Sequence, residues 1–402
     1  MIKKSLIELI YQAANIQRWN DHLRPTGFTE IDKQAHKMII AYVIAKFEER
    51  DRKTSVHWRS LIEGGIYEFL HRVVLTDIKP PVFHKLMSQS GDKLNNWVLD
   101  QLKEDTMEVK GDFFAKFQRY LFDDEYCLLE KRILRASHYL ATNWEFKIIY
   151  NLNKNIYGVD ETKKSIENEL EEHYDLVGVQ KLGLGKKTYN FIDLVGQLRF
   201  QKRWAHSPRV PETSVLGHML IVAILSYLVS LELNACDKRV CNNYYAGLFH
   251  DLPEVLTRDI ISPIKRSVEG LEDLIEEIEK TQVAEKILPL LPEAWHKELK
   301  YFIEDAFKSK IMHKDIIQFP RLGQISKKYN QDVYSPIDGE MIKDCDNLAA
   351  FIEASLSISH GITSRHLEEA LTSIYAKYEG KSMGEFDFWH LFNYFKLEKE
   401  QA

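Results

Sequence analysis

The sequence predicts an all-α protein, built as a tandem repeat of two similar helical bundles. Eighteen glycines and eleven prolines in 402 residues are few helix breakers, since the two together make up about 12% of an average chain. Apolar residues recur at helical spacing in most segments, and no long stretch alternates as a strand would. Two parts of the chain also match each other in residue pattern. These three observations are taken in turn below.

The composition is that of a globular protein. Apolar residues make up 45% and charged residues 28% of the chain, which excludes a disordered chain. Fifty-four basic against sixty acidic residues give a net charge of −6, so we expect no nucleic-acid partner. Four scattered cysteines form no C-x-x-C pair and favour free thiols in a reducing compartment.

No membrane partner is expected either. The first residues lack the apolar run and small-residue cleavage site of a signal peptide. The longest apolar stretch, Met219 to Leu231, has 13 residues, whereas a membrane span needs about 18 or more. We therefore expect a cytoplasmic protein.

The clearest helical segments lie in the second half. Residues His218–Leu233 are apolar nearly all round and predict a central buried helix, with Ser214 placed as its N-cap. Residues Asn242–Thr257, Leu271–Leu288 and Met341–Ser359 each carry leucine or isoleucine at intervals of three and four.

The internal repeat is seen in three blocks. Residues 16–19 resemble 201–204, at an offset of 185. Residues 135–145 parallel 343–353, at an offset of 208. Between them we align the halves at an offset of 182, which pairs Glu30 with Glu212, His36 with His218, Ala41 with Ala223, Gly65 with Gly247, and Asp77 with Asp259. The alternative is two unrelated helical segments with similar apolar spacing.

The repeat divides the chain into domains 1–185 and 186–402. The glycine-containing stretch Lys181–Lys187 is the expected linker. The second copy carries 26 extra residues, which we place near 308–337, where Pro320, Gly323 and Pro336 interrupt helical pattern. This insertion is expected to cap a site or to form an interface.

One group of residues in the second half suggests metal chemistry. His250 and Asp251 are adjacent, and Glu254 follows one helical turn later. His218 lies 32 residues before His250, and Asp346 lies on a later helix. Two imidazoles and two carboxylates from several helices suit a divalent metal with open positions for water. Helical facing favours Asp346 over the nearby Asp344.

This H…HD…D pattern resembles the HD-domain metal-dependent phosphohydrolases, and within them the bacterial 5′-deoxynucleotidases. The resemblance covers about residues 188–402. Arg203 and Trp204 stand about 15 residues before the first histidine, as in that branch. The run from His250 to Lys265 also follows its pattern H-D-x-x-E-V-L-T-x-D-I/L-x-x-P-I/V-K.

The resemblance implies a role for each matching residue. The metal ligands would be His218, His250, Asp251 and Asp346. The bound ion would be a single divalent cation, Mn, Co, Fe, Ni, Zn or Mg. Glu254 would assist proton transfer, although a supporting role behind the ligands is the alternative.

The substrate residues follow in the same way. Arg203 would bind phosphate, and Trp204 would pack on the sugar and disfavour a 2′-hydroxyl, unless it is a core residue. Asp259 would lie near the sugar or the attacking water, or would simply cap a helix.

The implied reaction is removal of phosphate from nucleoside 5′-monophosphates, with a preference for deoxynucleotides, by attack of a metal-bound water. The partner would be a nucleotide-like phosphorylated small molecule. Alternatives are another HD activity, on a dNTP, a cyclic nucleotide or an alarmone, or a nucleotide sensor or scaffold without catalysis. Lys265 and Arg266 would favour polyphosphates if they face the metal. Gly217 departs from the branch, which commonly has an acidic residue just before the first histidine.

The first half is expected to be a degenerate HD-like domain without hydrolase activity. The alignment places Glu68, Phe69, Arg72 and His138 where the second half has His250, Asp251, Glu254 and Asp346. This half would brace the active one as an intramolecular pseudo-dimer, with further homo-oligomers left open. Arg18 and Trp19 persist, so a nucleotide effector is conceivable there. A residual metal site of His36, Glu68 and His138 is the weaker alternative.

Overall fold

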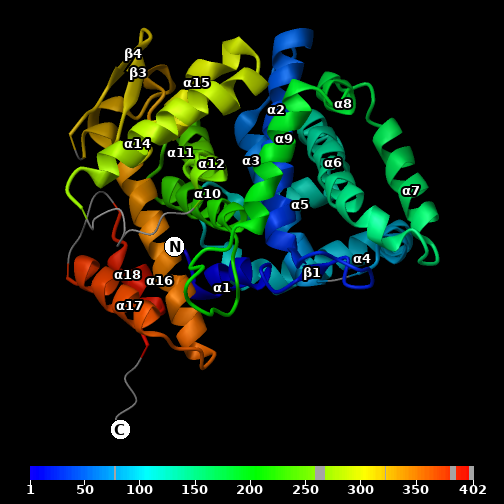
Figure 1. Ribbon diagram of the computed structural model, residues 1–402, viewed down its shortest axis with the longest axis horizontal. Helices are drawn as coiled ribbons and strands as arrows, with labels where there is room; N and C mark the ends of the chain where they lie inside the picture. The colour runs from blue at the N-terminus through cyan, green and yellow to red at the C-terminus, as the bar shows by residue number, and fades with distance from the viewer. Residues whose placement is uncertain (77, 259–267, 322, 381–385, 398–402) are drawn as a thin grey trace.

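Helices dominate the computed structural model, which confirms the all-α prediction (Figure 1). It describes residues 1–76, 78–258, 268–321, 323–380 and 386–397. Within these residues the only sheets have two strands each. The helices of the first half are α1 (Lys4–Gln12), α2 (Glu30–Arg52), α3 (Trp58–Leu75), α4 (Pro80–Thr106), α5 (Phe113–Phe122), α6 (Leu128–Asn153), α7 (Val159–Glu171) and α8 (Val177–Gly183).

The second half begins with α9 (Lys187–Gly196), which follows the predicted linker. Its other helices are α10 (Val215–Glu232), α11 (Asp237–Phe249), α12 (Glu254–Thr257), α14 (Leu271–Gln282), α15 (His296–Ile303), α16 (Gly339–Ser359), α17 (Arg365–Tyr378) and α18 (Trp389–Tyr394). The strands are β1 (Gln17–Arg18) and β2 (Phe28–Thr29) in one antiparallel pair, and β3 (Ile311–His313) and β4 (Ile316–Gln318) in the other.

The predicted central helix is confirmed as α10. Ser214 is its N-cap, with its hydroxyl accepting from the Gly217 N–H at 2.9 Å. α10 packs against α11 and against α2 of the first half. The buried apolar side chains of both halves form one continuous core. The two parts of the chain therefore share their hydrophobic interior, while a domain boundary near residue 186 stays a prediction.

α10 is also the one described helix long and apolar enough to cross a membrane. Ninety-four per cent of that window is buried inside the protein. A soluble protein's core helix has the same length and composition, and burial on all sides accounts for the apolar sequence here.

The predicted helix over 242–257 is broken. α11 ends at Phe249, and a turn at 250–253 precedes the short α12. Pro253 lacks the N–H that would continue the helical hydrogen bonding. His250 and Glu254 therefore do not share one face of a continuous helix, because His250 is the C-cap of α11 and Glu254 begins α12.

The first helix of each half packs on the other half. Tyr11 of α1 donates to the Ala349 carbonyl of α16 at 3.0 Å. Asp193 of α9 accepts from Trp144 Nε1 of α6 at 2.9 Å. In Figure 1, α9 accordingly runs beside α2, while α1 lies next to α16. This exchange ties the two halves together at both ends of the seam.

The extra residues near 308–337 form a closed excursion. The backbone groups of Lys310 and Ile337 bond to each other in both directions, at 2.9 and 2.8 Å, where the chain leaves and returns. The hairpin β3–β4 lies between them. Asn242 near the middle of α11 donates to Ser335 Oγ at 3.0 Å. The described contacts of the excursion thus do not place it over the predicted ligands.

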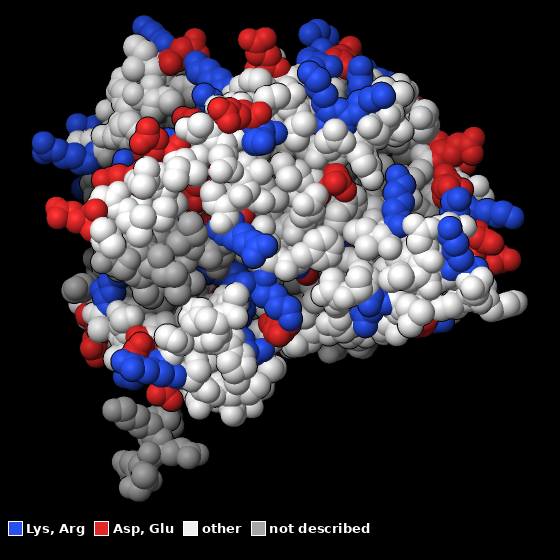
Figure 2. Space-filling view, viewed as in Figure 1, with Lys and Arg blue, Asp and Glu red and all other residues white. Residues whose placement is uncertain are grey.

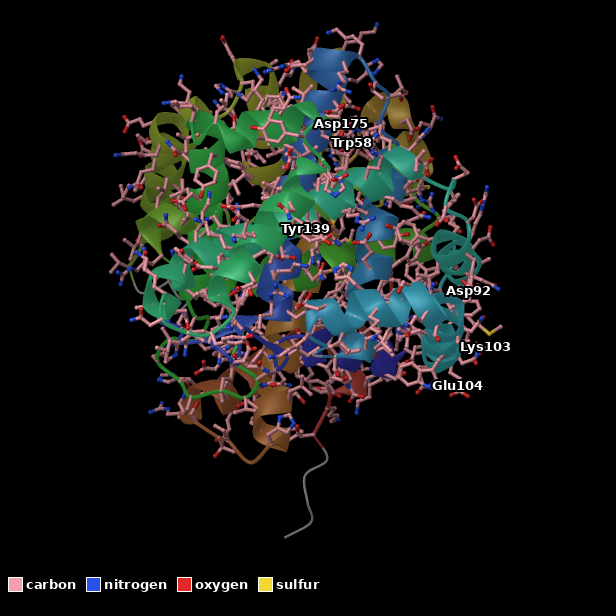
Figure 3. The ribbon with its side chains drawn as sticks, turned by 90° about the vertical axis from the view of Figure 1, so that its right-hand side faces the viewer. Trp58, Asp92, Lys103, Glu104, Tyr139 and Asp175 are labelled. Carbon is pink, nitrogen blue, oxygen red and sulfur yellow. The ribbon has the colours of Figure 1, made fainter. Side chains whose placement is uncertain are left out.

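Charged side chains of both signs are interspersed over the face shown in Figure 2. This agrees with a net charge of only −6. Figure 3 shows the first half from its outer side, with Tyr139 of α6 near the middle and Asp92, Lys103 and Glu104 of α4 at one edge.

Candidate metal centre

Two histidines face each other in the second half. His218 lies in the first turn of α10 and is fully buried. His250, at the end of α11, places its Nδ1 2.7 Å from the Gly247 carbonyl. With the proton on Nδ1, the lone pair of Nε2 is available to a metal. This buried Nε2 makes no hydrogen bond, although Asp251 Oδ2 lies 3.0 Å away.

Two carboxylates complete the group. Asp346 Oδ1 of α16 lies 3.0 Å from His218 Nε2, and one ligand atom each of His218, His250 and Asp346 falls within 4.8 Å of the others. Asp251 Oδ2 lies 3.9 Å from His218 Nε2. Asp344 instead accepts from Tyr378 at 2.5 Å. The structure therefore brings the four predicted ligands together, and a buried lone pair beside two carboxylates fits a divalent cation.

Electrostatics keep both carboxylates ionised. Burial opposes ionisation of Asp251, but His250, His218 and Arg203 together lower its pKa well below the ordinary value. Burial acts in the same way on Asp346, and Lys343 and His218 lower its pKa. An anionic pair beside two imidazoles is the state that a metal ion requires of its ligands.

Arg203 and Trp204 stand beside this group on a loop before α10. Arg203 Nη1 lies 3.6 Å from Asp251 Oδ2, and its side chain is 13% exposed. Trp204 is half-buried, and its Nε1 donates to Glu353 Oε2 at 2.8 Å. The backbone of Trp204 is in the left-handed region, at φ 57°. Both side chains thus lie where the group opens to solvent.

Glu353 of α16 organises these residues and was not singled out from the sequence. Its buried carboxylate accepts from Thr213 Oγ1 at 2.7 Å and lies 3.5 Å from Arg203 Nε. Its Oε1 is 3.7 Å from His218 Nδ1, on the side of the ring away from Asp346. Burial would raise the pKa of Glu353, but Arg209, Arg203 and His218 hold it well below its ordinary value. The only sequence signal for it was the match between residues 135–145 and 343–353.

The remaining predicted residues have different outcomes. Glu254 is buried at the start of α12, where its N–H donates to the Asp251 carbonyl at 3.0 Å. It therefore follows the ligand Asp251 directly. Asp259 lies outside the described residues, as do Lys265 and Arg266.

The missing acidic residue before His218 has a counterpart in the first half. A Cβ added to Gly217 would meet Asp32 Oδ1 at 3.0 Å. The same Asp32 oxygen accepts from Ser214 Oγ at 2.5 Å. The glycine at 217 thus leaves room for a carboxylate from α2.

The first half contains a matching set of contacts. Trp19 Nε1 donates to Glu145 Oε2 at 2.9 Å, as Trp204 does to Glu353. Trp19 also has a left-handed backbone, at φ 54°. Thr29 caps α2 as Ser214 caps α10. The tryptophans and the caps both correspond at an offset of 185.

This correspondence corrects the pairing of His36 with His218. At an offset of 185, Lys33 takes the place of His218. Lys33 Nζ lies 2.5 Å from His138 Nδ1, as His218 lies against Asp346. His36 instead places Nε2 2.9 Å from the Ile192 carbonyl of α9. The residual site of His36, Glu68 and His138 is not formed, because Glu68 and His138 each pair with a lysine.

Comparisons with known proteins agree with this centre. Residues 195–375 match the HD domain family. A 5′-deoxynucleotidase of Vibrio atlanticus is 24% identical over 195 residues, which cover 46% of this chain and 86% of that protein. A 5′-deoxynucleotidase of Pectobacterium atrosepticum is 26% identical over 124 residues, which cover 30% of this chain and 62% of that protein.

Proposed function

Because residues 195–375 belong to the HD-domain family of metal-dependent phosphohydrolases, we propose that this protein removes phosphate from nucleoside 5′-monophosphates and prefers deoxynucleotides. The observation that carries the proposal is the gathering of His218, His250 and Asp346 beside a partly exposed guanidinium, that of Arg203. The similar 5′-deoxynucleotidases support the choice of substrate. We place the reaction in the cytoplasm.

The centre would hold one divalent cation through His218, His250, Asp251 and Asp346. A divalent cation supplies a water of lowered pKa and polarises a phosphoryl oxygen when it is bound. His250 is kept in the right tautomer by the Gly247 carbonyl. Glu353 orients the ring of His218 from the opposite side, at 3.7 Å.

Arg203 binds the phosphate in this proposal. Its guanidinium lies between Asp251 and Glu353, at 3.6 and 3.5 Å, so it is held beside the metal ligands. A planar fork of donors matches the oxygens of a phosphate group. Glu254, which follows Asp251 by three residues, would hold or release the proton that hydrolysis moves.

Trp204 sets the preference for deoxyribose. Its indole is fixed by the bond to Glu353 Oε2 and presents an apolar surface beside Arg203. An apolar ring leaves a 2′-hydroxyl without a hydrogen-bond partner, which penalises a ribonucleotide.

The test is phosphate release from a panel of nucleoside and deoxynucleoside 5′-mono- and triphosphates, with Mn, Co, Mg and Zn supplied separately. Asp251→Asn is the inactive control. Release from deoxynucleoside monophosphates, abolished in the variant, supports the proposal. Release from triphosphates alone would overturn it in favour of another HD activity.

A further inference from the structure

A second group of charged residues lies in the first half, where it corresponds to the metal centre. Lys33 and Lys37 are both fully buried in α2. Lys33 Nζ contacts His138 Nδ1 at 2.5 Å, and Lys37 pairs with Glu68. Arg18 donates to Glu145 at 2.8 Å and to Glu30 at 2.9 Å.

Positive charge exceeds negative charge in this group. Its cations are Arg18, Lys33, Lys37, Arg72 and Arg199, and its carboxylates are Glu30, Glu68 and Glu145. An excess of buried positive charge is costly unless a counter-ion is present. Burial, together with the neighbouring cations, lowers the pKa of His138 well below its ordinary value. A bound anion would relieve both costs.

The group also reaches solvent. The side chains of Arg18, Arg72 and Glu68 are 12%, 21% and 31% exposed. Arg203 at the metal centre is exposed to almost the same extent as Arg18, at 13%. An anion could therefore enter from the surface and meet arginines before the buried lysines.

The residues that face substrate are kept while those that hold metal are replaced. Arg18 and Trp19 share Glu145 as Arg203 and Trp204 share Glu353. Lys33 and His138 stand where the other half has His218 and Asp346, and Phe69 stands where it has Asp251. A lysine ammonium here supplies the positive charge that a metal ion supplies there.

We propose that the first half carries a metal-independent site for a phosphate group, either of a nucleoside monophosphate or of free orthophosphate, and does not hydrolyse what it binds. The choice of a nucleotide rests on the proposed function, because it is taken from the likeness of Trp19 to Trp204. The requirement for a phosphate-sized anion rests on the charges alone.

The experiment uses the full chain carrying Arg203→Gln, with EDTA present, so that the second half lacks both its metal and its guanidinium. Isothermal titration with dAMP, and separately with orthophosphate, should show one site per chain. Arg72→Gln should weaken binding at least tenfold. Arg119→Gln is the matched control, because Arg119 is 62% exposed and pairs with Asp123 away from the group.

Tighter binding of dAMP than of orthophosphate identifies a nucleotide site, and equal binding identifies a phosphate site. No binding of either, or binding that Arg72→Gln leaves unchanged while the variant keeps its circular dichroism spectrum, overturns the proposal. The proposed function is judged separately, by phosphate release from the native chain with metal. Each can therefore fail without the other.

Discussion

Asp32 of α2 accepts a hydrogen bond from Ser214 Oγ at the start of α10, at 2.5 Å. The two residues are 182 positions apart and belong to different halves of the chain. The same serine hydroxyl accepts from the Gly217 N–H, one residue before the ligand His218. A carboxylate from the first half therefore supports the turn that presents a metal ligand in the second.

Gly217→Ala should destabilise the protein. The added Cβ would lie 3.0 Å from Asp32 Oδ1 and from Ile31 Cγ2, which is closer than ordinary contact. Overpacking of a buried seam costs about 1–3 kcal/mol, and the helix propensity gained offsets part of it. Denaturant unfolding measures the change.

Gly91→Ala is the control for that variant. Its added Cβ would meet only Met87 Cε at 3.6 Å, so helix propensity acts there without a clash. If Gly217→Ala were as stable as Gly91→Ala, the close approach of the two halves at this point would be wrong.

Glu353→Gln should lower kcat/KM about 10- to 100-fold, the usual cost of losing a group that orients a metal ligand. The amide cannot offer two anionic oxygens to Trp204, Thr213, Arg203 and His218 together. Steady-state kinetics check this, with Glu340→Gln of the same helix as the control, since Glu340 is exposed and contacts Ser309. Unchanged kinetics in Glu353→Gln would remove Glu353 from the site.

Mild acid should destabilise the fold partly through His36. Burial, with Arg199 beside it, lowers the pKa of His36 to about 3 from an ordinary value of 6.5. Between these values the unfolded chain binds a proton that the folded chain does not, so stability falls as pH drops below 6.5. One such group contributes about 1.4 kcal/mol per pH unit at most.

His36→Gln isolates this contribution. Unfolding free energies at pH 7 and pH 5 should differ less in the variant than in the native chain, by about one proton per molecule. His206→Gln, at an exposed histidine, is the control and should leave the pH dependence unchanged. An identical pH dependence in His36→Gln and the native chain would show that His36 is not held neutral.

The sequence was informative where a pattern repeats or where a local rule applies. Burial all round predicted α10, and Ser214 was the expected cap because its hydroxyl can accept from the first turn. The break after Phe249 was missed because apolar spacing continues through Leu252 and Val255, which hides the effect of Pro253. His36 was paired with His218 because identical residues aligned, whereas Lys33 fills the same place with a different one.

Contacts between distant segments could not be predicted. Glu353 and Arg209 are single charged residues with no motif, and only folding brings them against His218. The crossing of α1 and α9 onto opposite halves leaves no trace in periodicity, because an amphipathic face does not say which partner covers it.

The most direct test of the account is the number of metal ions that one chain holds. The protein would be stripped with EDTA, reloaded with Mn²⁺, passed through a desalting column and measured by elemental analysis. We predict one ion per native chain, none in Asp346→Asn, and one in Asp344→Asn, whose carboxylate contacts Tyr378 instead. One ion retained in Asp346→Asn, or two in the native chain, would contradict a single centre built by the second half.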